Sequence, residues 1–157
     1  MSTPQDRLQE DVKAALKAGH KTRLSTVRLL LGEVKNERIR TGRDVDETTF
    51  LGLVQRAIKR RREAAEQYRK GHRPELAEQE EQEAAILAAY LPPPASESEL
   101  RTAAQELAGQ LGATGPAALG PMMKALRDRF AGRAEGTTLQ RIVRDVLSSL
   151  GKATSGS

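Results

Sequence analysis

Three consecutive prolines, residues 92–94, constrain the fold of this chain more than any other feature. Proline has no amide hydrogen for the helical ladder and disfavours the helical conformation in the residue before it, so the preceding helix is predicted to end at Leu91. A proline run is also a semi-rigid spacer. The sequence therefore predicts two folded units, residues 1–91 and 95–151, held apart by this linker, with residues 152–157 as a disordered tail.

Both units have the periodicity of amphipathic helices. Apolar residues recur every three or four positions on either side of the prolines, and no alternating strand pattern occurs. Glycine and proline positions divide the first unit into four helices and the second into three. The predicted helix N-caps are Thr3, Asp46 and Ser96, and Asp6 and Glu99 are placed to complete capping boxes. The fold class predicted from these patterns is all-α.

Residues that usually carry catalysis or bind metals are sparse. The absence of cysteine excludes disulfides, thiolate metal sites and cysteine nucleophiles. His20 and His72 each stand beside a glycine at a predicted helix end, where a cationic ring suits the helix dipole. No phosphate-binding loop or dinucleotide fingerprint occurs. We therefore predict no catalytic residue, no cofactor and no metal site.

The sequence also bears on location. No apolar run approaches the roughly 18 residues that a membrane-spanning helix needs, and the first residues lack the apolar stretch of a secretory signal. From these two observations we predict a cytoplasmic protein with no membrane partner.

Basic residues are concentrated in residues 13–73, which hold seventeen Lys or Arg against seven Asp or Glu. Arg61 falls on the apolar stripe of its helix, so we expect it to be structural and to need a carboxylate partner. Arg56, Lys59 and Arg62 are expected to be exposed, where they could contact a phosphate backbone. Pairing with nearby glutamates would instead give a solvated helix face with no ligand. With four aromatic residues in the chain, all predicted to face inward, no platform for stacking bases is expected.

Three blocks of the sequence resemble the GatB/YqeY family. They are LKAGHKTRLSTVRLLLGEVKNERI at residues 16–39, IKRRREAAEQYRKGHRPELAEQEEQEAAILAAYLP at 58–92, and LGPMMKALRDRFAGRAEGTTLQRIVRDVL at 119–147. Their order and spacing are similar to those of the free-standing YqeY-like proteins. The chain departs from the usual family pattern at Ala64 and Pro121.

The resemblance implies a four-helix unit joined to a three-helix unit. The second is similar to the tail domain of the B subunit of the glutamine-dependent tRNA amidotransferase. In that enzyme the tail contacts tRNA, while amide transfer takes place in other domains. By matching positions, the resemblance places tRNA contact at Lys124, Arg127, Arg133, Arg141 and Arg144.

The family is also associated with carbon–nitrogen ligase activity that uses glutamine as donor. We attribute that activity to the complex, because this chain lacks a kinase-like or amidase-like part. The leading interpretation is a non-catalytic accessory protein that binds tRNA, with an amidotransferase or an aminoacyl-tRNA synthetase as candidate protein partner. The alternative is a helical adaptor that docks another protein and uses its basic residues only for solubility. A third interpretation, an enzyme in its own right, is disfavoured by the missing catalytic constellation.

Overall fold

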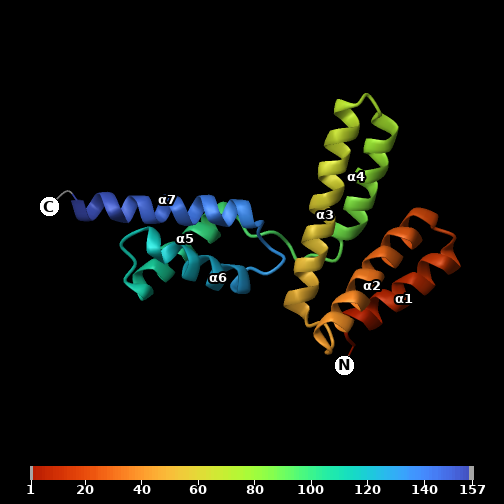
Figure 1. Cartoon of the computed structure of the whole chain (residues 1–157), viewed down its shortest axis with the longest axis horizontal. Helices are drawn as coiled ribbons and strands as arrows, with labels where there is room; N and C mark the ends of the chain where they lie inside the picture. Colours follow the sequence, from red (N-terminus) through yellow and green to blue (C-terminus); the bar gives the residue numbers. More distant parts are fainter. Residues whose placement is uncertain (1, 156–157) are drawn as a thin grey trace. The chain divides into compact units, whose positions relative to one another are not determined.

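The computed structural model describes residues 2–155, with side chains for residues 2–152. Every regular element in this part of the chain is a helix (Figure 1), which confirms the predicted all-α class. Internal packing divides the chain between Pro92 and Pro93 into two compact units. We call them unit 1, which ends at Pro92, and unit 2, which begins at Pro93.

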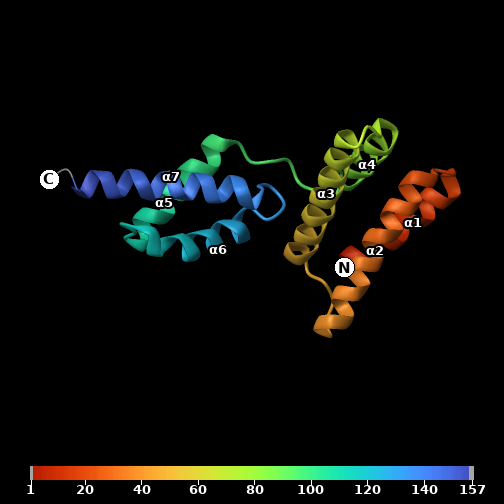
Figure 2. The same cartoon turned by 45° about the horizontal axis from the view of Figure 1, so that its top comes forward.

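Unit 1 consists of two antiparallel helical hairpins, and in each hairpin the two helices lie side by side in both Figure 1 and Figure 2. Helix α2 also packs against α3 and α4, which joins the hairpins into one unit. The helices are α1 (Pro4–Ala18), α2 (Lys21–Thr41), α3 (Glu47–Lys70) and α4 (Pro74–Ala88). The largest fully buried side chains between them are Leu8, Val27, Leu30, Val34, Phe50, Val54 and Leu87.

Local capping explains where several helices begin. The Thr3 hydroxyl accepts a hydrogen bond from the Asp6 amide, and the Asp6 carboxylate accepts one from the Thr3 amide, as predicted for a capping box. Asp46 caps α3 through the amide of Thr49 at 2.8 Å. These hydrogen bonds lower the pKa of both aspartates, because each one stabilises the ionised carboxylate.

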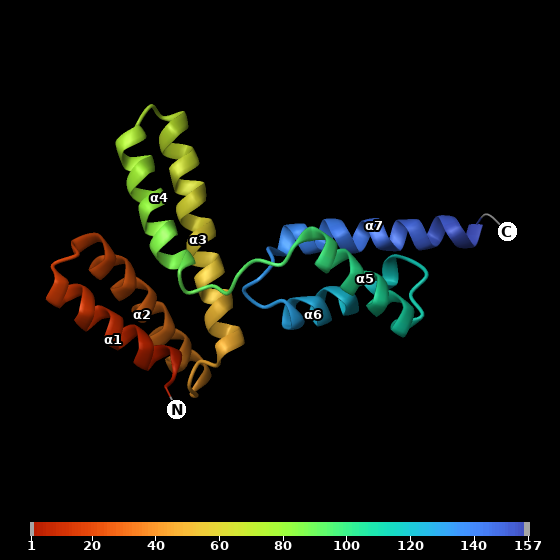
Figure 3. The ribbon, with the colours of Figure 1, turned by 180° about the vertical axis from the view of Figure 1, so that it is seen from behind.

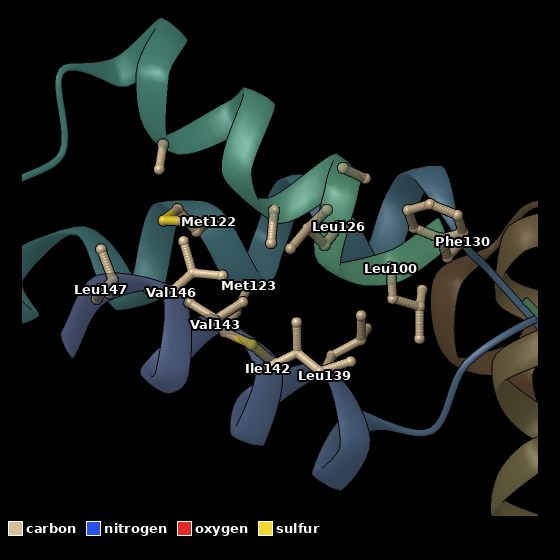
Figure 4. Packing of buried hydrophobic residues seen from close by; sticks show 13 residues of the cluster. Leu100, Met122, Met123, Leu126, Phe130, Leu139, Ile142, Val143, Val146 and Leu147 are labelled. Carbon is tan, nitrogen blue, oxygen red and sulfur yellow. The ribbon is translucent and has the colours of Figure 1, made fainter. Parts of the chain in front are cut away.

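Unit 2 consists of α5 (Glu97–Leu111), a short 3-10 helix η1 (Pro116–Ala118), α6 (Leu119–Arg129) and α7 (Gly136–Ser155). Helices α5 and α6 both pack against α7, and Figure 3 shows α5 crossing α7 obliquely. Side chains from all three helices point toward one another in a shared apolar core (Figure 4). Its members include Leu100, Met122, Leu126, Phe130, Leu139, Ile142 and Val143.

Two helix ends differ from the sequence prediction. Helix α4 ends at Ala88 rather than Leu91, because the amides of Tyr90 and Leu91 donate to carbonyls only three residues back and tighten the chain into turns. Helix α7 continues to Ser155, so residues 152–155 are helical where a disordered tail was predicted. Residues 156 and 157 of that predicted tail lie outside the described part of the chain.

Candidate nucleic-acid interface

Arg61 occupies the interface between α3 and α4. Its Nε lies 3.3 Å from a carboxylate oxygen of Glu83, and these side chains are only 13% and 15% exposed. Its Nη1 donates to the carbonyl of Ala57 at 3.5 Å. Burial, together with the like charge of Glu83, raises the pKa of neighbouring Glu80. Arg61 therefore neutralises a carboxylate-rich interface, which confirms the predicted structural role.

The other three cations predicted on α3 have different surroundings. Lys59 lies 4.0 Å from Glu63 in an exposed ion pair on the same helix. Arg62 is exposed and interacts with other residues of the chain. Arg56 is exposed and has no ion pair within residues 2–152. The three residues therefore do not form a shared unpaired surface.

In unit 2, Arg133 connects the turn before α7 to the proline linker. Its Nε donates to the carbonyl of Pro93 at 3.1 Å, and its Nη2 lies 3.2 Å from Glu99 of α5. Its carbonyl accepts from the amide of Ala95 at 2.8 Å. The guanidinium also lies 5.7 Å from the centre of the Phe130 ring. Resemblance to the tail domain suggested tRNA contact at Arg133, but its guanidinium is already engaged within unit 2.

The pairing of Glu99 with Arg133 also affects the start of α5. The hydroxyl of Ser96 accepts from the Glu99 amide at 3.1 Å, so the predicted N-cap is present. A full capping box also needs the Glu99 carboxylate to accept a hydrogen bond from the Ser96 amide. Here that carboxylate forms an ion pair with Arg133 instead. Half of the predicted capping box is therefore formed.

Arg141 of α7 is also engaged with α5. Its Nη1 donates to Glu97 at 2.8 Å, which lowers the pKa of Glu97 and raises that of Arg141, since each charge stabilises the other. Asp145 lies one turn from Arg141, but its ion pair is with Arg101 of α5, at 3.5 Å. Carboxylates and guanidinium groups thus alternate across the exposed α5–α7 junction.

The remaining predicted cations of unit 2 lie on the α6 side of α7. Arg144 and Asp145 are 100° apart around α7, on opposite sides of its exposed face, and Asp145 faces α5. Arg144 therefore lies on the side of α6. The side chain of Arg127 reaches the start of α7, because its Nη2 lies 3.9 Å from the position that a Cβ atom on Gly136 would occupy. Lys124 precedes Arg127 by one turn.

We call Lys124, Arg127 and Arg144 the α6–α7 cations. All three are exposed, and none forms an ion pair with another residue in the described part of the chain. Of the five residues predicted in unit 2, these three keep charges available for a ligand, whereas Arg133 and Arg141 are neutralised by α5.

No group of three or more His, Cys, Asp or Glu able to hold a metal occurs among the described residues. Within residues 2–155, none of the helices is long and apolar enough to cross a membrane.

The sequence matches a model of a known protein family. The family is described as Yqey-like protein, and the match covers residues 5–147. This chain belongs to the YqeY-like protein family. The match spans both helical units, so it bears out the resemblance stated from the three sequence blocks.

Curated relatives occur in fungi. One from Lachancea thermotolerans is 35% identical over 112 residues, which covers 69% of this chain and 60% of the relative. Another, from Vanderwaltozyma polyspora, is 32% identical over 108 residues, or 66% of this chain and 58% of the relative. Both are named altered inheritance of mitochondria protein 41, mitochondrial. The chain thus spans about three-fifths of the length of these relatives.

The names of the relatives correct one prediction. They are called mitochondrial proteins, and the same name is carried by a relative from Pyrenophora tritici-repentis that is 29% identical over 57% of this chain. This finding contradicts the cytoplasmic location predicted from the sequence, so that prediction is wrong by this comparison.

Proposed function

We propose that this YqeY-like protein is a non-catalytic accessory protein that binds tRNA through the α6–α7 cations. The observation that carries the proposal is that Lys124, Arg127 and Arg144 are exposed without a carboxylate partner in the described part of the chain. Such cations can neutralise phosphates and release counterions without breaking a contact of the protein. The resemblance of unit 2 to the amidotransferase tail domain supports tRNA as the polyanion.

The remaining predicted RNA-binding residues take other roles in this proposal. Arg133 and Arg141 would have to give up ion pairs with Glu99 and Glu97 before binding phosphate, so we assign them to the stability of unit 2. In unit 1, Arg56 stays a candidate for peripheral phosphate contact. An amidotransferase or an aminoacyl-tRNA synthetase remains the proposed protein partner, and any carbon–nitrogen ligase activity would reside in that complex.

Salt dependence separates tRNA binding from the adaptor alternative. Phosphate contact predicts that log affinity falls steeply with log salt concentration, because each neutralised phosphate releases counterions. Docking of another protein through an apolar face predicts a weak dependence on salt.

The test is a filter-binding titration of the full chain with bulk tRNA across salt concentrations. A triple variant, Lys124→Gln, Arg127→Gln and Arg144→Gln, should remain folded while the slope of log affinity against log salt falls by about two to three. A matched control, Lys13→Gln, Arg40→Gln and Lys59→Gln, removes the same charge from cations that are paired on their own helices. An unchanged slope in the folded triple variant would refute the assignment of this surface.

A further inference from the structure

Helix α2 carries a row of cations that lies outside the candidate interface described above. The row consists of Lys21, Arg28 and Lys35, which are seven residues apart. Seven residues at 100° each fall about 20° short of two full turns, so the three side chains lie along one side of the helix. At 1.5 Å per residue the row is about 21 Å long. All three side chains are exposed. We call them the α2 row.

The α2 row is not neutralised by the protein. None of its three side chains forms a hydrogen bond or an ion pair within the described residues. The two carboxylates of α2 are engaged elsewhere, since Glu33 pairs with Arg60 at 2.5 Å and Glu37 binds Arg40. Both glutamates also lie on other sides of the helix. The row therefore presents three positive charges with no acidic residue of α2 beside them.

The row lies outside the buried face of α2. Most buried residues of α2, which include Val27, Leu30 and Val34, lie roughly 100° to 160° around the helix from Arg28, and buried Leu31 lies about 60° away. Neighbouring cations of the row are about 10.5 Å apart along the axis, close to the Debye length of about 10 Å at 0.1 M salt, so they repel each other only weakly. In the described part of the chain, the fold gains no hydrogen bond or ion pair from these charges.

We infer that the α2 row is a second surface for nucleic acid, one that contacts the phosphate backbone of a duplex. Duplex DNA carries about one phosphate per 1.7 Å of axis, so a row about 21 Å long passes about a dozen phosphates, which gives each flexible cation a partner. A partner helix from a protein would need apolar side chains between the charges to pack against. The residues on this side of α2 between the three charges are half-buried Leu24, Ser25, buried Leu31 and Gly32, so no large exposed apolar side chain stands between them. The exposed Ile39 lies one turn beyond Lys35, past the end of the row.

The inference does not depend on the α6–α7 cations, because those lie in unit 2 and the row lies in unit 1. Each surface can therefore be removed while the other is kept. If both surfaces bind the same RNA, the losses in log affinity caused by removing each surface should add in a variant that lacks both.

The test uses the full chain and a 20-base-pair RNA duplex as probe. The variant Lys21→Gln, Arg28→Gln, Lys35→Gln should weaken binding at low salt by at least about fivefold and lower the salt slope by about two to three. The control Lys13→Gln, Arg40→Gln, Lys59→Gln, with equal loss of charge, should change the slope by less than about one. Thermal unfolding of both variants should match wild type.

Three results would overturn the inference. The first is an unchanged slope in the folded α2-row variant, whether or not the α6–α7 variant binds more weakly. The second is an equal effect of the paired-cation control, which would show that only net charge matters. The third is competition by polyglutamate as effective as competition by the duplex at equal charge, which would point to an acidic protein.

Discussion

The Nε of Arg61 lies 3.3 Å from the carboxylate of Glu83 at the α3–α4 interface, where both side chains are mostly buried. Removing the guanidinium would leave a buried carboxylate without its counter-charge. We predict that Arg61→Ala lowers the free energy of unfolding by about 2 kcal/mol or more. The control Lys59→Ala, on the exposed side of α3, should change it by no more than about 0.5 kcal/mol. Urea denaturation measures both values, and equal small effects would contradict the structural role of Arg61.

Glu80 should make the stability of the protein depend on pH. Its raised pKa means that the folded chain holds a proton at pH values where the unfolded chain has released it, so stability falls as pH rises from the ordinary value of 4.5 through the raised one. Glu80→Gln removes this penalty, so the variant should be more stable than wild type at neutral pH and should lose that advantage in acid. Thermal melts from about pH 4 to 8 test this. The exposed Glu78→Gln serves as control, and a destabilised Glu80→Gln at neutral pH would refute the prediction.

Tyr90 ties the end of α4 to α1. Its hydroxyl donates to Asp11 at 2.5 Å, and its ring meets Phe50 edge to face with centroids 6.0 Å apart. Tyr90→Phe keeps the ring and removes the hydrogen bond, so we predict a loss of about 1 kcal/mol in the free energy of unfolding. Tyr68→Phe is the matched control, and no hydrogen bond of the Tyr68 hydroxyl occurs within the described residues. A larger loss in the control would argue against a stabilising Tyr90–Asp11 bond.

Arg133 holds the linker to unit 2 through both its side chain and its backbone. Arg133→Ala would remove the hydrogen bond to Pro93 and the ion pair with Glu99 but keep the backbone bond to Ala95. We predict a loss of about 1 to 2 kcal/mol in the stability of unit 2, whereas the exposed Arg144→Ala should cost no more than about 0.5 kcal/mol. Hydrogen exchange of α5 and α7 amides reports on this unit separately. Equal protection in the two variants would be the contrary result.

Features fixed by neighbouring residues could be predicted from the sequence. The caps at Thr3, Asp46 and Ser96 depend on atoms within three residues, and the inward position of Arg61 follows from helical periodicity alone. Periodicity alone is not always sufficient, because it also places Arg38 on the apolar stripe of α2, whereas Arg38 is exposed and pairs with Asp44 at 3.1 Å. Helix α2 has 21 residues and α1 has 15, so the last turn of α2 extends beyond its partner.

The pairing of the candidate site could not be predicted in the same way. Whether Arg133 and Arg141 are free depends on Glu99 and Glu97, which lie 34 and 44 positions away and meet them only after α5 packs on α7. Local spacing alone would pair Arg141 with Asp145, four residues along the same helix. The α2 row can be seen in the sequence as cations spaced seven residues apart. That these cations are unpaired becomes clear only from the structure, in which Glu33 and Glu37 pair with other residues.

We propose that the unpaired cations of unit 2, and not its ion-paired ones, contact tRNA. Two double variants with equal loss of charge test it: Arg127→Gln with Arg144→Gln, and Arg133→Gln with Arg141→Gln. The measurement is the slope of log affinity for bulk tRNA against log salt concentration, on protein confirmed to be folded. We expect the slope to fall by about one to two in the first variant and by less than about 0.5 in the second. A larger reduction of the slope in the second variant than in the first, or an equal reduction in both, would refute the proposal.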